Sequence, residues 1–352
     1  MRLFLALQLL ISAADQTQSF DTLRYEGRDA LLQSRYADAE RLLMAAIQEA
    51  ERGGGVDQPL RAVVLNDLAE VYRGTRQFDE AETYYKESVS ILRRSSESAR
   101  AFVMVLNNLG ALYRNRGQYL RSAACYEEAM AVAKKSLPAN DPLFGTILHG
   151  LAAFSAWKGD LKNAQKQLES SLRIRESSLG SESYEVADTL NSIGTLQLQM
   201  KQYAKAQDSF RRSLLLLENL YGPNHSDVAT ILNNLGVALR TQKKFAEAEP
   251  VLQRSVHLHR TNLSPNAIEV ADAVFNLAQL YIDQERFAES ESLLREVVAI
   301  RNSHHHRASD TDALAYEHYA LVLRRNGRTA DANTAEAQAK SIRSELRYTF
   351  KP

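Results

Sequence analysis

Hydrophobic positions recur along this chain with a helical period, and that pattern is repeated over a much longer period. One typical stretch carries hydrophobic residues at i, i+1, i+4 and i+8, namely Ile231, Leu232, Leu235 and Leu239. A second stripe begins at Phe245, after a short polar segment. Such stripes predict amphipathic helices that bury one side. The short polar segment predicts that the two helices form an antiparallel hairpin.

Two markers show that this hairpin is repeated. The first is an aromatic or apolar residue with a small residue three positions later: Tyr36/Ala39, Phe78/Ala81, Tyr119/Ser122, Leu161/Ala164, Tyr203/Ala206, Phe245/Ala248, Phe287/Ser290 and, more weakly, Thr329/Ala332. The second is an apolar residue followed directly by a small one: Leu68-Ala69, Leu109-Gly110, Leu151-Ala152, Ile193-Gly194, Leu235-Gly236, Leu277-Ala278 and Tyr319-Ala320. Both recur every 42 residues, with one step of 41. Two registers with one period predict an array whose units pack on their neighbours.

The predicted fold is all-α, a right-handed α-solenoid (superhelix) of about eight antiparallel helical hairpins within residues 20–346. The hairpins are expected near 22–58, 59–98, 99–140, 141–182, 183–224, 225–266, 267–308 and 309–346, followed by a tail at 347–352. The first and last hairpins depart from the pattern, and we expect both to act as caps with polar outer faces.

The repeats resemble the tetratricopeptide repeat (TPR). Its Leu-Gly, Tyr and Ala-x-x-x-Phe positions correspond here to Leu109, Gly110, Tyr113, Tyr119, Ser122 and Tyr126. The 42-residue step exceeds the standard 34, and the connections at 168–194 and 215–236 are similar to those of kinesin light chains. The resemblance extends over about residues 22–345 and indicates a long-repeat type that is common in bacteria. It implies a non-enzymatic scaffold that binds a peptide or partner protein on its concave surface. The alternative is a structural or assembly subunit that uses convex faces and ends.

Asparagines cluster in the first helix of each hairpin, just before the apolar-small marker. They are Asn66, Asn107, Asn108, Asn191, Asn233, Asn234 and Asn276, and His149 takes the equivalent place in one hairpin. A side-chain amide offers both a donor and an acceptor, which suits a peptide backbone. The resemblance implies that Asn at these positions contacts bound peptide. The alternative is a ladder of Asn side chains between neighbouring helices.

Arginines recur five residues after the marker Leu, at Arg73, Arg114 and Arg240, and again at Arg324. If they face the groove, they favour acidic peptides, because Arg binds carboxylates in a bidentate manner. The alternative is a solvated helix end whose charge complements the helix dipole. Trp157, the only Trp, either anchors an apolar group of a ligand or packs at a helix edge.

The charge balance of the chain restricts the class of partner that it is expected to bind. Lys plus Arg and Asp plus Glu both number 43, so the balanced charge argues against nucleic acid or an anionic membrane as the main partner. The sequence contains no recognisable catalytic or cofactor-binding motif, and we expect neither a cofactor nor an enzymatic activity. Three adjacent His at 304–306 are a weak metal signal, and no metal is predicted. Cys125 is expected to be a small core residue.

The first 19 residues differ from the rest, with Arg2 followed by an apolar run and small residues at Ser12 to Ala14. This pattern is typical of a signal peptide. The alternative is an apolar helix that packs on the first repeat. A cleaved signal predicts a periplasmic or secreted protein without a mature membrane span, and otherwise we expect a cytoplasmic one.

Overall fold

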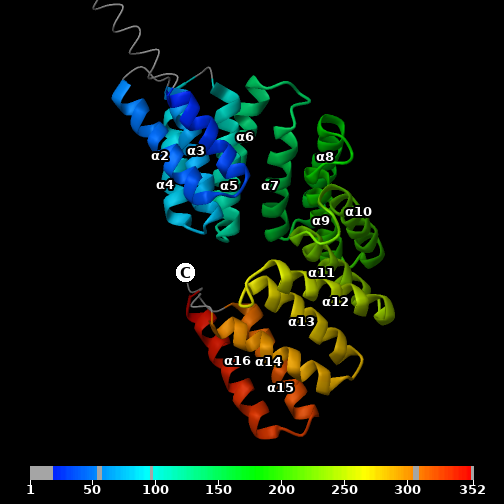
Figure 1. The fold of residues 1–352 in the computed structure, drawn as a ribbon. Coiled ribbons are helices and arrows are strands. Elements are labelled where there is room, and N and C mark those ends of the chain that lie inside the picture. The colour runs from blue at the N-terminus through cyan, green and yellow to red at the C-terminus, as the bar shows by residue number, and fades with distance from the viewer. Residues whose placement is uncertain (1–18, 54–57, 96–97, 304–308, 350–352) are drawn as a thin grey trace, which may run out of the picture. The chain divides into compact units, whose positions relative to one another are not determined.

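The computed structural model describes residues 19–53, 58–95, 98–303 and 309–349, and these ranges are almost entirely helical (Figure 1). The predicted signal segment lies outside the described residues, apart from Ser19. After a helix over 19–32, the chain forms α2 (Tyr36–Gly53), α3 (Gln58–Gly74), α4 (Phe78–Leu92), α5 (Ala99–Asn115), α6 (Tyr119–Ser136), α7 (Leu143–Trp157), α8 (Leu161–Leu179), α9 (Tyr184–Gln199), α10 (Tyr203–Tyr221), α11 (Ser226–Thr241), α12 (Phe245–Asn262), α13 (Ile268–Asp283), α14 (Phe287–Ser303), α15 (Asp310–Arg325) and α16 (Thr329–Thr349). The predicted all-α repeat solenoid is confirmed.

The helices pair in chain order, and they group into two compact units, Met1–Leu179 and Gly180–Pro352. In the N-terminal unit, α3 pairs with α4, α5 with α6 and α7 with α8. In the C-terminal unit, the pairs are α9 with α10, α11 with α12, α13 with α14 and α15 with α16. We call the first helix of each pair the A helix and the second the B helix.

The turn between A and B helices is the same in every hairpin. Each turn has one residue with a left-handed backbone two positions before the B helix: Ser34, Arg76, Gly117, Gly159, Lys201, Lys243, Glu285 and Gly327, with φ between 56° and 83°. Glycine adopts this conformation without strain, whereas other residues pay a steric cost. The conserved geometry explains why the hairpin repeats at a constant spacing even where the turn residue is not glycine.

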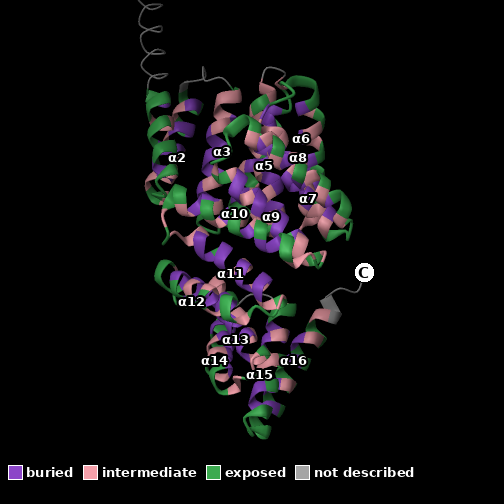
Figure 2. Ribbon diagram, turned by 90° about the vertical axis from the view of Figure 1, so that its right-hand side faces the viewer, coloured by how far each residue is buried: buried purple, intermediate pink, exposed green. Residues whose placement is uncertain are grey.

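Small residues let the two helices of a hairpin approach closely, as the sequence predicts. A Cβ atom added at Gly236 would lie 2.4 Å from Leu252 on the paired B helix. Buried serines add a hydrogen bond at a recurring place, because Ser171 Oγ donates to the Gly145 carbonyl and Ser255 Oγ to the Ala229 carbonyl. The buried faces of the helices therefore meet along each hairpin, with exposed residues on the opposite sides (Figure 2).

The two terminal hairpins differ in their outer surfaces. On α16 the buried positions are small or aliphatic, including Ala332, Ala335 and Ile342, and most of the exposed ones are polar or charged. The helix over 19–32 instead exposes Tyr25 and Leu32, at 75% and 77%. The exposed positions of this first helix are thus mostly polar, but they include two large hydrophobic residues seven apart.

Candidate functional site on the A-helix face

Positions on the A helices are counted from the first residue of the apolar-small marker. This reference residue is Leu68 on α3, Leu109 on α5, Leu151 on α7, Ile193 on α9, Leu235 on α11, Leu277 on α13 and Tyr319 on α15. The predicted site residues then fall at positions −2, −1 and +5.

The asparagines form a ladder between successive A helices. In the N-terminal unit, Asn108 Nδ2 donates to Asn66 Oδ1 at 2.9 Å. In the C-terminal unit, Asn234 Nδ2 donates to Asn191 Oδ1 at 2.8 Å, and Asn276 Nδ2 to Asn233 Oδ1 at 2.9 Å. Each rung joins position −1 of one hairpin to position −2 of the hairpin before it. The ladder arrangement is therefore present, and it orients six of the seven asparagines.

Asn107 is the exception. Its side chain is buried, with 4% exposed, and neither its Nδ2 nor its Oδ1 has a hydrogen-bond partner among the described residues. The donor expected from the next hairpin is missing because position −1 of α7 is Gly150. A Cβ atom there would lie 2.2 Å from the Tyr126 ring, so a side chain at this position would force the ring to move. Leaving a buried polar group unpaired costs about 1–3 kcal/mol.

One further rung is replaced by an aromatic contact. Between α13 and α15, Phe275 at position −2 and His318 at position −1 meet edge to face, with ring centroids 5.3 Å apart. On α7, His149 is buried and its Nδ1 lies 3.0 Å from Arg175 Nη1 on α8.

The arginines at position +5 are mostly neutralised within the protein. Arg73 pairs with Glu70 on its own helix, and its Nε donates to Glu70 Oε2 at 3.0 Å. Arg240 Nη1 lies 2.8 Å from Asp283 Oδ2, and Arg324 Nη1 lies 2.6 Å from Glu336 Oε1. Arg114 is partly buried and has no carboxylate partner among the residues that the structure describes.

Trp157 packs on two aromatic rings at the edge of its hairpin. Its ring stacks on Tyr119 and Phe154, with centroids 5.3 Å and 5.8 Å away. It nevertheless remains 53% exposed at the end of α7. The stack fixes the ring's orientation and leaves much of its surface open to solvent.

Family models describe most of this chain as tetratricopeptide repeat. One model matches residues 18–94, 143–214, 194–261 and 227–303, and a second matches 103–143. The chain belongs to the tetratricopeptide repeat family. A search of curated proteins finds no matching sequence.

Solved structures with the same fold include three of different descriptions. BtubC (BKLC) from P. vanneervenii has a TM-score of 0.54 and 22% identity, over 65% of this chain and 91% of that one. The apo form of the quorum sensor NprR from B. thuringiensis has a TM-score of 0.63 and 18% identity, over 81% and 77%. A STAND protein with a tetratricopeptide repeat sensor from Pyrococcus horikoshii has a TM-score of 0.62 and 15% identity, over 90% and 47%. The repeats of this TPR protein are of the long, kinesin light chain-like type that the sequence predicts.

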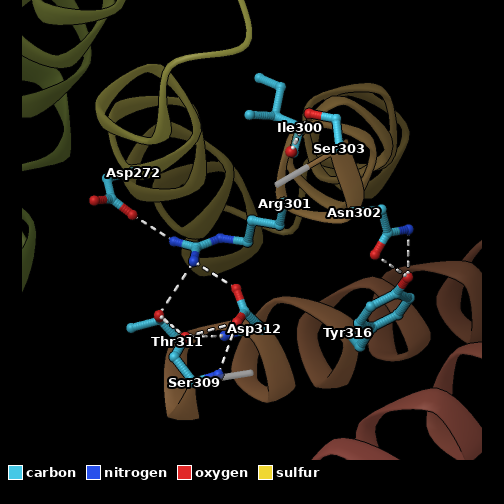
Figure 3. Close-up of polar contacts among 9 residues, drawn as sticks. All are labelled: Asp272, Ile300, Arg301, Asn302, Ser303, Ser309, Thr311, Asp312 and Tyr316. Atoms are coloured by element: carbon cyan, nitrogen blue, oxygen red, sulfur yellow. Dashed lines mark hydrogen bonds and ion pairs between the residues drawn. The ribbon is translucent and has the colours of Figure 1, made fainter. Parts of the chain in front are cut away.

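The structure also reveals a charged cluster that sequence reasoning missed. Buried Arg301 on α14 reaches Asp272 on α13 and, at 2.8 Å, Asp312 on α15, and it also donates to Thr311 (Figure 3). Burial alone would raise the pKa of Asp312, but hydrogen bonds from Arg301 and Ser309 outweigh it and lower that pKa. A signal was present, because positions 175, 259 and 301 place Arg, His and Arg at a 42-residue spacing or its double.

His259 holds the position of Arg301 one hairpin earlier, without the two aspartates. It is buried, and its Nδ1 has no partner among the described residues. Burial lowers the pKa of this imidazole, and Glu269 opposes the shift.

Other candidate chemistry is limited. Cys125 is buried, and burial raises the pKa of its thiol to about 11, which agrees with an unreactive core residue. The three adjacent His at 304–306 lie outside the described residues. Within the described ranges, no group of three or more His, Cys, Asp or Glu has a metal-binding arrangement. A helix with the length and apolar character of a membrane span is also absent from those ranges.

Proposed function

We propose that this TPR protein is a non-catalytic scaffold that binds a peptide or a partner protein along its A-helix face. The observation that carries the proposal is the asparagine ladder. A side-chain amide has two N–H donors and an acceptor oxygen, and a rung uses only part of that capacity. Asn108, Asn191, Asn233, Asn234 and Asn276 all remain partly accessible. The ladder therefore holds a row of amides in fixed orientations, ready to bond a peptide backbone.

The related structures support a binding role. NprR is a quorum sensor, and the STAND protein contains a tetratricopeptide repeat sensor. A sensor of this fold works by recognising another molecule, and we extend that general role to this chain. The preferred partner is a protein or an acidic peptide, and the balanced charge disfavours nucleic acid.

The proposal is tested by replacing Asn108, Asn191 and Asn233 together by Ala and comparing partner capture from the native host by mass spectrometry. We expect specific partners to be lost, because these amides would no longer bond a ligand. An exposed asparagine on a B helix, Asn219, provides the control substitution. Circular dichroism of each variant verifies that it is folded. Unchanged capture by a folded triple variant would refute the proposal.

The alternative role, an assembly subunit, is favoured by one observation. Tyr25 and Leu32 expose a hydrophobic strip on the first helix, where a neighbouring molecule could stack. Under this alternative, Leu32→Asp dissociates an oligomer that the unmodified protein forms in sedimentation experiments. A monomeric unmodified protein contradicts self-assembly through this end.

For localisation, we propose that residues 1–19 are a cleaved signal and that the protein is periplasmic or secreted. N-terminal sequencing of the mature protein tests this. A mature chain that begins at Met1 would indicate a cytoplasmic protein.

A further inference from the structure

Two exceptions to the pattern of the A-helix face lie on the same helix of the N-terminal unit. Asn107 is the one predicted asparagine outside the ladder, and Arg114 is the one position +5 arginine without a carboxylate partner among the described residues. They are seven residues apart on α5, so they lie on one face of that helix, two turns apart. The unpaired Asn107 amide and the Arg114 guanidinium, which has no carboxylate partner among the described residues, therefore lie on the same side of α5.

The next A helix, α7, also departs from the repeat pattern at two residues seven positions apart. Gly150 removes the donor that would pair with Asn107, and Trp157 follows seven residues later on α7. In the C-terminal unit, Arg240 at position +5 pairs with Asp283, which is at position +6 of the next hairpin. Arg114 and Trp157 hold those same two positions. An exposed aromatic ring thus replaces the carboxylate that neutralises Arg240.

The charges at the C-terminal end of α7 favour an anionic ligand. Exposed Lys158 lies with Nζ 5.4 Å from the centroid of the Phe154 ring, and no carboxylate pairs with it among the described residues. Asp160 is the nearest acidic residue in sequence, and its Oδ1 accepts from the Asn163 backbone N–H at the start of α8. Arg114 on α5 and Lys158 at the end of α7 are therefore both without a carboxylate partner among the described residues.

We infer that the surface formed by α5 and α7, which we call the ladder gap, binds a peptide segment with a carboxylate beside an aliphatic side chain. The carboxylate pairs with Arg114, and the aliphatic group packs on Trp157 where its ring is open to solvent. This inference rests on the proposed peptide-binding function and assigns it to one place and one ligand chemistry.

Trp157 gives a direct test, because it is the only Trp in the protein. The probes are synthetic decapeptides that carry one Glu and one Leu at varied spacings, with matched versions in which Gln replaces Glu. We expect at least one Glu peptide to shift Trp157 emission to shorter wavelength, since binding removes the ring from water. The Gln version is expected to bind about tenfold more weakly or worse.

Substitutions at Arg114 and Arg240 compare the ladder gap with the equivalent surface of α11 and α13. Arg114→Gln is expected to lower the affinity for the Glu peptide by about tenfold or more, and to change the affinity for the Gln peptide little. Anisotropy of a labelled peptide measures both affinities. Arg240→Gln, in which the lost charge is already neutralised by Asp283, is the matched control and should change the affinity by less than about threefold.

The outcomes distinguish the two proposals. Peptide binding that leaves Trp157 emission unchanged, or that Arg240→Gln weakens as much as Arg114→Gln, overturns the ladder gap but keeps the scaffold function. Loss of host partners on the triple Asn substitution, without any decapeptide bound, also overturns the ladder gap alone. Failure of both experiments overturns the proposed function and the inference together.

Discussion

The asparagine ladder differs between the two units of this TPR protein. In the C-terminal unit, two successive rungs join α9, α11 and α13, and an aromatic contact continues the series to α15. In the N-terminal unit, the ladder stops after one rung, because Gly150 has no side chain to pair with Asn107. Hairpins with the same fold thus present different chemistry on their A helices. One missing side chain is enough to change a satisfied surface into one with unused donors and acceptors.

The largest effect on stability is expected at Arg301, in the C-terminal unit. Arg301→Met leaves the buried Asp312 without its cation, and removing one partner of a buried pair costs about 3–5 kcal/mol. Urea unfolding followed by circular dichroism measures the loss. Arg260→Met removes a more exposed pair with Glu296 and should cost less than about 1 kcal/mol. Equal losses in the two variants would show that Arg301 does not hold α13, α14 and α15 together.

The ladder gap can be challenged by adding the missing side chain. Gly150→Asn supplies a donor for Asn107 but forces a Cβ atom against the Tyr126 ring, so we expect destabilisation by about 1–3 kcal/mol. Combining it with Tyr126→Leu should cost less than the sum of the two single changes. Gly159→Asn, in an open turn with nothing near a Cβ, is the control and should have a small effect. A fully stable Gly150→Asn variant would contradict the steric reason given for the gap.

A smaller effect on stability is expected at His259, which holds the repeat position of Arg301 one hairpin earlier. The pKa of His259 is lowered in the folded protein, so below about pH 6.5 the unfolded chain takes up a proton that the folded protein resists. Stability should therefore fall as the pH decreases through this range, by at most about 1.4 kcal/mol per pH unit from this group. Melting temperatures at pH 7.5 and 5.5 measure the change, and His259→Leu should reduce it. An unaltered pH dependence in that variant would exclude His259 as its source.

Much of the fold could be predicted because it depends on local periodicity. The 42-residue markers locate the hairpins and the close helix crossings at Gly194 and Gly236. The roles of the asparagines could not be decided, because each rung joins residues 42 or 43 positions apart and depends on the distance between helices. The Arg301 cluster was missed for a similar reason, since its carboxylates come from two other helices. Comparing equivalent positions between hairpins, as at Gly150, exposes such differences.

The most direct test of this account applies one substitution at two equivalent positions. Asn107→Leu replaces an unpaired buried amide by an apolar group of similar size, and should raise the free energy of unfolding by about 1 kcal/mol. Asn233→Leu breaks a rung and leaves Asn276 without its acceptor, and should lower it by about 1 kcal/mol. Urea unfolding of both variants beside the unmodified protein gives the two differences. Opposite signs are the predicted result, and a similar loss in both would contradict the claim that the ladder is interrupted at Asn107.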